Sequence, residues 1–160
     1  MHIDFQKIVL KKISETEIDE MVSHRIDYLT EMQGKQELSA IHQLHCELRK
    51  YFSTNIKNKH IIALVAYSES KAVSYGAIVL RTIPGDFAAP SYLEGDIINM
   101  YTIPEARKQG VSTVVLNALI SEARQVGVSK LALHTTIAGE KLYRKAGFAD
   151  PVFPYLEMVL

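Results

Sequence analysis

The sequence predicts an α/β (α+β) fold with a mixed, mostly antiparallel central sheet flanked by helices. Three observations support this prediction. Two segments with helical periodicity precede the first long β-rich run, two β-rich runs are separated by only four residues, and a strand–helix–strand unit lies between residues 93 and 135. The expected order of elements is β-α-α-β-β-β-α-β-α-β, and the strand–helix–strand unit implies one parallel pair of strands.

The first part of the chain is expected to contain one strand and two helices. Residues 1–10 fit a first strand, and Ser14 and Glu17 then have the spacing of a capping box, which starts a helix. Apolar residues recur at helical spacing up to Gly34, which ends this helix, and recur again between Leu38 and Phe52. Two helices therefore precede the central sheet.

The middle of the chain is expected to form three strands. Residues 60–67 and 72–80 are rich in β-branched and apolar side chains, and the short segment between them fits a hairpin. Residues 82–91 contain two prolines and a glycine, which predict a loop. The third strand covers residues 93–103 and is closed by Pro104, because proline cannot continue a strand ladder.

The last part of the chain completes the expected order. Residues 111–125 have the apolar stripe of an amphipathic helix, which ends at Gly127. A short strand at 130–135 and a short helix at 139–145, ended by Gly147, are expected to follow. Residues 153–160 are expected to form a closing strand.

Composition agrees with a single domain over residues 1–160. The chain is 48% apolar, which is typical of one globular domain with its own core. Eighteen basic and eighteen acidic side chains cancel, so we expect neither nucleic acid nor membrane as a partner. Cys46 is the only cysteine, which excludes an intramolecular disulfide and fits a cytoplasmic location. No apolar run approaches the roughly 20 residues that cross a bilayer.

The most informative stretch is residues 96–113, which read as a strand, a short basic turn and the start of an amphipathic helix. A helix start offers unpaired amides and the positive end of the helix dipole, and Gly110 lets backbone approach an anion closely. Arg107 and Lys108 add positive charge. This pattern alone fits an anion site and an ordinary helix start equally well.

Two motifs decide between these interpretations. The segment Arg107-Lys108-Gln109-Gly110-Val111-Ser112 resembles motif A of the GNAT acyltransferases, (Gln/Arg)-x-x-Gly-x-(Gly/Ala), with Ser112 in place of the usual glycine or alanine. Downstream, Leu142-Tyr143-Arg144-Lys145-Ala146-Gly147-Phe148 resembles the second signature of that family, a short helix that carries Leu-Tyr and ends in Gly-Phe. The dinucleotide fingerprint Gly-x-Gly-x-x-Gly and the P-loop Gly-Lys-Ser/Thr do not occur in the sequence.

The resemblance implies a GNAT-like sheet in which the parallel strand pair splays apart at the CoA site, with acetyl-CoA or another acyl-CoA as cosubstrate. Backbone groups of Met100, Tyr101 and Thr102 would bind the pantetheine arm. The pyrophosphate would meet the amides of a second set of residues, with Arg107 and Lys108 nearby: Gln109, Gly110, Val111, Ser112 and Thr113. Thr136 stands where relatives commonly have an asparagine that hydrogen-bonds the CoA arm.

The resemblance also implies catalytic residues. Tyr143 would give a proton to the departing CoA thiolate, and a phenol with a pKa of about 10 is protonated at neutral pH, as an acid must be. The alternative is that Tyr143 only packs the short helix onto the sheet. Asp96 is the first candidate for the base that deprotonates the amine, and Glu94 lies on the same strand face. Alternatively, both carboxylates only solvate the start of the strand, and Asn99 is expected on the opposite face.

The expected function is transfer of an acetyl or other short acyl group from acyl-CoA directly to a primary amine. The alternative is a non-catalytic acyl-CoA sensor or regulatory module of the same fold. The acceptor is left open among a polyamine, an antibiotic amine, an amino acid, a peptide amino terminus and a lysine side chain. His42, His45 and Cys46 form the one metal-like group, but no second ligand pair follows, so we expect no metal. A homodimer through the sheet edge or the carboxyl-terminal strand is compatible with the predicted fold.

Overall fold

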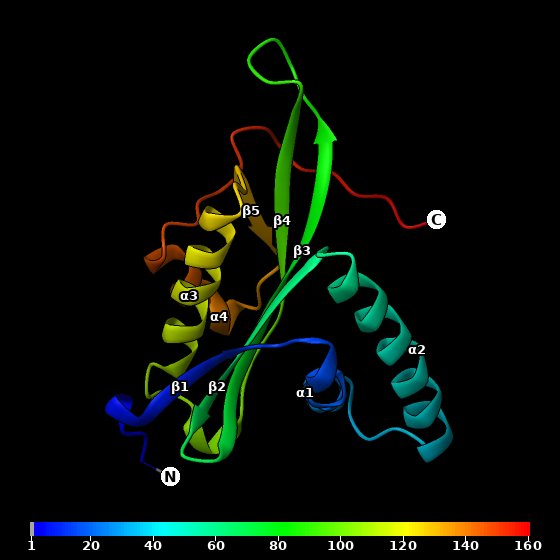
Figure 1. The fold of residues 1–160 in the computed structure, drawn as a ribbon, viewed down its shortest axis with the longest axis vertical. Helices are drawn as coiled ribbons and strands as arrows, with labels where there is room; N and C mark the ends of the chain where they lie inside the picture. The colour runs from blue at the N-terminus through cyan, green and yellow to red at the C-terminus, as the bar shows by residue number, and fades with distance from the viewer. Residues whose placement is uncertain (1) are drawn as a thin grey trace.

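The computed structural model describes residues 2–160 and contains the predicted elements up to the last helix (Figure 1). The first strand is shifted toward the carboxyl terminus, because a 3₁₀ turn occupies Phe5–Lys7. The strands and helices are β1 (Ile8–Lys12), α1 (Ile18–Gln33), α2 (Leu38–Lys57), β2 (Ile61–Ser68), β3 (Lys71–Pro84), β4 (Ser91–Thr102), α3 (Val111–Gln125), β5 (Lys130–Leu133) and α4 (Ile137–Lys145).

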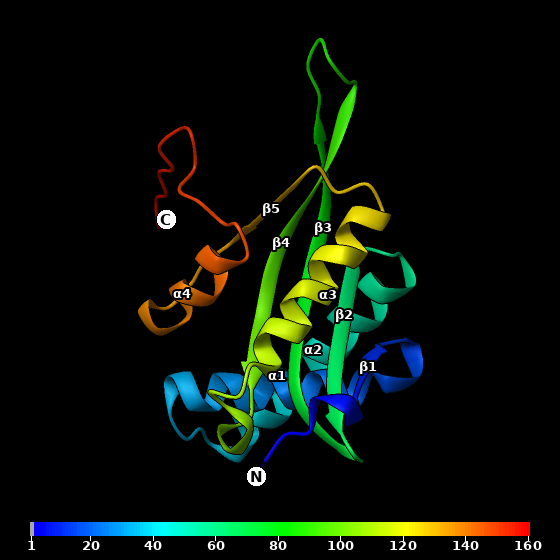
Figure 2. The ribbon, with the colours of Figure 1, turned by 90° about the vertical axis from the view of Figure 1, so that its left-hand side faces the viewer.

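The central sheet has the order β1-β2-β3-β4-β5. Strands β1 to β4 pair with their neighbours in antiparallel fashion, while β4 and β5 are parallel, which confirms a mixed, mostly antiparallel sheet. The parallel ladder is short, running from Glu94 opposite Lys130 to Ile97 opposite Leu133. Beyond that point β4 continues to Thr102 while β5 ends, and Figure 2 shows the chain after β5 turning away toward α4.

Helices cover both faces of the sheet, with α3 on one side and α1 and α2 on the other (Figure 1). On the α3 side, Val115, Leu116 and Leu119 pack on sheet residues that include Ile78 and Ile97. On the opposite side, Met21 and Val22 of α1 and Phe52 of α2 pack on the sheet. The sheet residues of this core include Val65, Tyr75 and Ala77. The predicted capping box of Ser14 and Glu17 is present, but it caps a 3₁₀ turn at Glu15–Glu17, and α1 begins directly afterwards at Ile18.

An irregularity in β4 changes which face its side chains take. The pairing of β3 and β4 shifts register between Tyr75 and Ala77, and Asn99 opposite this shift has a φ of 58°. A regular strand would send Asn99 to the opposite face from Asp96, but the bulge turns it toward α1, so that prediction is wrong. Met100 takes the α3 face, where its sulfur fills the space that a side chain on Gly76 would need.

The loop expected at 82–91 is shorter than predicted, because β3 extends to Pro84 and β4 begins at Ser91. The amide of Gly85 donates to the carbonyl of Pro90 at 3.0 Å and the amide of Asp86 to that of Ala89 at 2.8 Å, which closes a tight hairpin.

The predicted closing strand at 153–160 is wrong. These residues form no strand, because a strand needs a neighbour for its backbone groups, and Pro151 and Pro154 interrupt any ladder here. We call residues 150–160 the carboxyl-terminal segment. Its large apolar side chains are exposed: Val152, Phe153, Tyr155, Leu156, Met158, Val159 and Leu160.

Candidate active site

The loop before α3 has the backbone form that an anion site requires. Lys108 and Gly110 both have positive φ, 59° and 85°, and α3 begins directly afterwards at Val111. The first amides of a helix have no partner four residues earlier, so those of Val111 and Ser112 can face an anion at the positive end of the helix dipole. The amide of Thr113 already donates to the carbonyl of Gly110 at 3.0 Å.

The amino-terminal turn supports this loop. A side chain placed on Gly110 would meet the ring of Phe5 at 3.4 Å, and the amide of Ile3 donates to Oε1 of Gln109 at 2.9 Å. The Gln109 side chain therefore holds the amino terminus, while its backbone belongs to the loop. The 3₁₀ turn at Phe5–Lys7 lies directly beside the predicted phosphate site.

The side chain of Arg107 is directed to α1. Its Nη2 lies 2.6 Å from Oε2 of Glu31, and its Nε donates to the carbonyl of Thr102 at 2.8 Å. Its guanidinium also lies 5.5 Å from the ring centre of Tyr101. The hydrogen bond to Arg107 is the main cause that lowers the pKa of Glu31, and the same contact raises the pKa of Arg107. Lys108, the other basic residue proposed for the loop, is exposed beside the helix start.

The three residues proposed for the pantetheine arm lie beyond the last β4–β5 pair. Tyr101 and Thr102 pair with β3 on one side, through Tyr75 and Ser74, and the other side of β4 has no strand partner there. Met100, Tyr101 and Thr102 therefore lie in the part of β4 that has diverged from β5. We call the region between the two strands beyond Ile97 and Leu133 the gap. The carbonyls of Tyr101 and Thr102 already accept from Ser74 Oγ at 3.0 Å and from Arg107 Nε at 2.8 Å, so an extended ligand would have to use the remaining backbone groups of this side.

Tyr143 of α4 lies in the core on the α3 side of the sheet, in the cluster against which Met100 and Leu133 also pack. It is only 9% exposed and lies edge-on to Phe148, with the ring centres 5.9 Å apart. Burial is the main cause that raises the pKa of Tyr143 above its ordinary value, and the nearby phenol of Tyr28 on α1 raises it further.

Thr136 caps α4, because its Oγ1 accepts a hydrogen bond from the amide of Gly139 at 3.2 Å. Its hydroxyl is therefore already engaged in local structure. Thr136 nevertheless lies in the short connection between β5 and α4, on the far side of the gap from Met100 and Tyr101.

Glu94 and Asp96 share one face of β4, as predicted, and Arg81 on β3 contacts both. Arg81 Nη2 lies 3.2 Å from Glu94 and its Nε lies 3.6 Å from Asp96. Lys130 Nζ lies 2.6 Å from the other oxygen of Glu94, which is 6% exposed. Glu94 is thus buried in the middle of β4 between two cations, whereas Asp96 is more exposed and its one ion pair is long.

Sequence reasoning missed a row of three side chains on α1: Arg25, Tyr28 and Glu31. They recur every three residues and face the part of β4 that borders the gap. Arg25 Nη1 donates to Oδ1 of Asn99, its guanidinium lies 5.7 Å from the ring centre of Tyr28, and the Tyr28 ring lies 6.3 Å from that of Tyr101. The signal that could have found them is this polar and aromatic row beside the apolar stripe of the helix.

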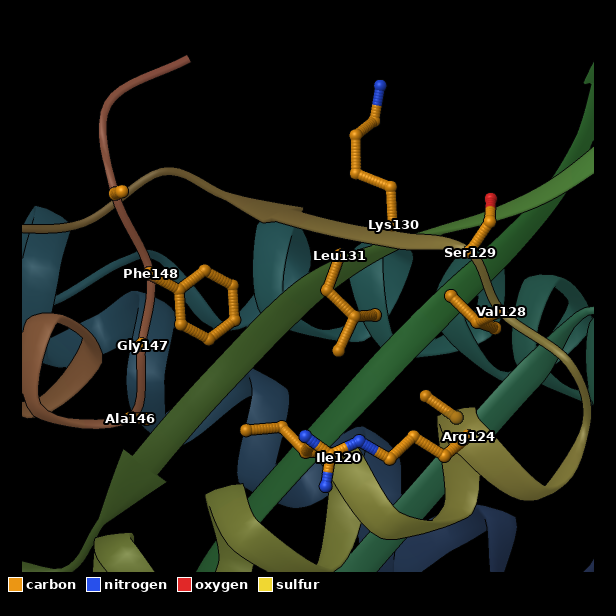
Figure 3. Close-up of a pocket in the computed structure, with 11 residues that line it drawn as sticks. Ile120, Arg124, Val128, Ser129, Lys130, Leu131, Ala146, Gly147 and Phe148 are labelled. Carbon is orange, nitrogen blue, oxygen red and sulfur yellow. The ribbon is translucent and has the colours of Figure 1, made fainter. Parts of the chain in front are cut away.

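Other features lie away from the gap. A cavity of about 300 Å³ lies between the end of α3, β5 and the segment after α4, with Ile120, Leu131 and Phe148 among its lining residues (Figure 3). None of the predicted site residues lines it. Cys46 Sγ lies 3.9 Å from Nε2 of His42, and no group of three or more His, Cys, Asp and Glu side chains within residues 2–160 could hold a metal ion. In that same range, no helix has the length and apolar character needed to span a membrane.

The fold and this site define a class of protein. A parallel strand pair that splays beside the start of a helix, with a buried tyrosine across the gap, is the arrangement expected of an acyl-CoA-dependent N-acyltransferase. The model of the acetyltransferase (GNAT) family matches residues 19–148, which is most of the chain. The chain therefore belongs to the GNAT family, whose reaction is acyl transfer from acetyl-CoA to an amine, and a non-catalytic sensor is not favoured.

Solved structures agree with this family. A predicted acetyltransferase from Clostridium acetobutylicum, solved with acetyl-CoA, is 26% identical with a TM-score of 0.82, over 95% of this chain and 96% of that one. Glucosamine-6-phosphate N-acetyltransferase from Arabidopsis thaliana is 14% identical with a TM-score of 0.68, over 94% and 97% of the two chains.

A third similar structure is a ribosomal-protein-alanine N-acetyltransferase from Brucella melitensis, which is 15% identical with a TM-score of 0.66, over 95% and 99% of the two chains. The Arabidopsis and Brucella proteins show similarity of fold alone. A comparison with curated proteins found no significant match. The acceptor therefore has to be inferred from this chain's own residues.

Proposed function

We propose that the protein is an active acetyl-CoA-dependent N-acetyltransferase that moves the acetyl group directly to a primary amine of a small molecule or peptide. The observation that supports the proposal is that Tyr143 is buried in the same core cluster as Ile97, where the β4–β5 ladder ends, with Leu133 packed against that cluster. The start of α3 follows β4 and the start of α4 follows β5, so both helix starts lie at the carboxyl ends of the parallel pair. Ligands of α/β sheets bind at such ends.

In the proposed complex, acetyl-CoA is held mainly by backbone. The amides of Gln109 to Thr113 would bind the pyrophosphate, and the open side of β4 from Met100 to Thr102 would bind the pantetheine arm. Lys108 would add charge near the phosphates. Arg107 would act indirectly, because its contacts with Glu31 and Thr102 fix the loop against α1. Thr136 would border the arm from the other side of the gap.

The chemical step needs one proton donor and one proton acceptor. The amine nitrogen attacks the thioester carbonyl, the carbon–sulfur bond breaks, and the thiolate takes the phenol proton of Tyr143. The raised pKa of Tyr143 supports this role, because the group stays protonated at neutral pH. Asp96 is the better candidate for removal of the amine proton, through water, because Glu94 is already paired with Arg81 and Lys130.

Two expectations about the surroundings of the protein remain part of the proposal. A cytoplasmic location is supported by the single cysteine, Cys46, which forms no disulfide within the chain. A homodimer is supported by the outer edge of β5, which pairs with no strand in the described part of the chain, and by the exposed carboxyl-terminal segment.

Calorimetric titration with acetyl-CoA, CoA, ATP and NAD tests the cofactor before any acceptor is known. We expect micromolar binding of acetyl-CoA and CoA and no comparable binding of ATP or NAD. A screen of amines for thiol release would follow. Binding without thiol release from any amine would favour the sensor, and a lack of CoA binding would contradict the proposal itself.

A further inference from the structure

Arg25 lies on the side of the gap from which the acceptor must arrive. The proposed acetyl-CoA site uses the start of α3, which covers one face of the sheet (Figure 1). The amine has to reach the thioester from the other face, which is covered by α1 and α2. The bulge at Asn99 turns that side chain toward this second face, and Arg25 of α1 donates to it.

The guanidinium of Arg25 is half-buried and has no carboxylate partner. Of the other five arginines, four form ion pairs and Arg124 is exposed: the paired ones are Arg49, Arg81, Arg107 and Arg144. Within residues 2–160, the contacts of Arg25 are with the neutral amide of Asn99 and the ring of Tyr28. A partly desolvated cation is costly unless it is paired, so this one is suited to an anion that arrives with a ligand.

The neighbours of Arg25 hold it in a fixed orientation. Asn99 Nδ2 donates to the buried hydroxyl of Tyr75 at 3.1 Å, which leaves Oδ1 of Asn99 to accept from Arg25. Tyr28 packs against the guanidinium, with the ring centre 5.7 Å away. The nearest acidic residue in the α1 row, Glu31, is already paired with Arg107. Arg25 is therefore held against Asn99 and Tyr28 without an ion pair in the described part of the chain.

We propose that Arg25 binds an anionic group on the acceptor, a carboxylate or a phosphate, and so selects amines that carry one. Arginine presents a planar fork of N–H donors that matches both groups in a bidentate way. Asn99 occupies one of these donors and leaves the rest of the fork for the ligand. The inference rests on the proposed N-acetyltransferase function and adds the class of its substrate.

The test compares matched pairs of amines by thiol release. Lysine against cadaverine tests a carboxylate, and glucosamine 6-phosphate against glucosamine tests a phosphate. We expect kcat/KM to be at least tenfold higher for the anionic member of one pair. Arg25→Gln should remove this preference by raising KM for the anionic amine, with little change for the neutral one and an unchanged Kd for acetyl-CoA.

Three further variants separate charge recognition from folding. Arg25→Lys keeps the charge and should retain part of the preference, while Asn99→Asp supplies a carboxylate to Arg25 and should abolish it. Arg124→Gln removes an exposed, unpaired arginine outside the site and should change nothing. All variants would be compared by thermal unfolding, so that a loss caused by misfolding is recognised.

Several results would overturn the inference. Turnover without preference in either pair, or a preference that survives in Arg25→Gln, would remove Arg25 from acceptor recognition. A weaker Kd for acetyl-CoA in Arg25→Gln would assign the cation to the cofactor instead. Acetyl-CoA binding without turnover of any amine would overturn the enzymatic function and this inference together, whereas turnover that ignores charge would overturn the inference alone.

Discussion

Arg107 Nη2 lies 2.6 Å from Glu31 Oε2, and this ion pair joins the loop before α3 to the carboxyl-terminal half of α1. The two helices cover opposite faces of the sheet, so the pair links the cofactor side with the acceptor side. Both side chains are about two-fifths exposed, and an ion pair of this kind contributes roughly 0.2–1 kcal/mol to stability. Its main effect should therefore be on the position of the loop.

Glu31→Gln should weaken acetyl-CoA binding severalfold while it lowers the free energy of unfolding by less than about 1 kcal/mol. The reason is that Arg107 loses the carboxylate that holds it and the loop against α1. Calorimetry and denaturant unfolding measure the two effects. Asp19→Asn is the matched control, because it breaks the exposed pair with Arg49 away from the loop. Equal acetyl-CoA affinity in all three proteins would show that the pair does not position the loop.

Tyr143→Phe should lower kcat by about 10²-fold or more, because positioned general acids contribute factors of this size. The Kd of acetyl-CoA should stay within about twofold, since the ring and its contact with Phe148 are kept. The acid must be protonated, so wild-type activity should persist on the alkaline side until the pH passes the raised pKa of Tyr143, above 10. An unchanged kcat in the variant would leave Tyr143 only its packing role.

Gly110→Val should weaken acetyl-CoA binding at least tenfold. The φ of 85° at Gly110 is a conformation that β-branched residues avoid, so the loop must change shape to accept valine. Gly127→Val is the matched control, because Gly127 has a φ of 81° and open space around it at the far end of α3. Both variants should lose stability, but only the first should lose affinity. A similar loss of affinity in both would indicate a general effect of strain.

Asp96→Asn should mainly affect activity, whereas Glu94→Gln should mainly affect stability. Asp96→Asn should lower kcat without much effect on stability, because Asp96 is more exposed and its ion pair is long. Glu94→Gln should lower stability by about 1–2 kcal/mol, because Arg81 and Lys130 lose a buried carboxylate but remain solvated themselves. Rate measurements across pH and denaturant unfolding separate the two. Identical pH–rate profiles for both variants and the wild type would exclude each carboxylate as the base.

Acid should weaken the start of α1 at a defined pH. Contacts with Lys11 and Ser14 lower the pKa of Glu17 to about 2, below its ordinary value of 4.5. A carboxyl whose pKa is lower in the folded state stabilises the protein above pH 4.5, and this contribution is lost as the pH falls toward 2. Glu17→Gln should thus melt at a lower temperature than the wild type at pH 6, and the difference should disappear near pH 2. A constant difference across this range would contradict the assignment.

Most of the fold follows from local patterns in the sequence. The helices α1, α2 and α3 and the strands β2, β3 and β4 have clear periodicity, and their turns have the expected residues. The carboxyl-terminal strand was wrong because apolar composition does not supply the neighbouring edge that a strand needs. The face of Asn99 was wrong because a bulge depends on packing against β3, which alternation along one strand does not encode.

The candidate cofactor residues were proposed from the sequence, whereas the acceptor side was missed. The motif around Gly110 and the signature that carries Tyr143 were found through their resemblance to the GNAT family. The contact between Arg25 and Asn99 joins residues 74 positions apart, and it depends on the bulge that turns Asn99 toward α1. The same holds for Arg107, whose charge suggested a phosphate ligand although its carboxylate partner lies in the first helix.

The exposed carboxyl-terminal segment has a consequence for the protein in solution. The chain carries no net charge at pH 7, so molecules in a concentrated sample do not repel one another over long distances. Attraction between apolar side chains of the segment is then unopposed. Self-association in solution should therefore depend on the carboxyl-terminal segment rather than on the rest of the fold. A buffer pH away from 7 should reduce it, because the molecules then carry a net charge of the same sign.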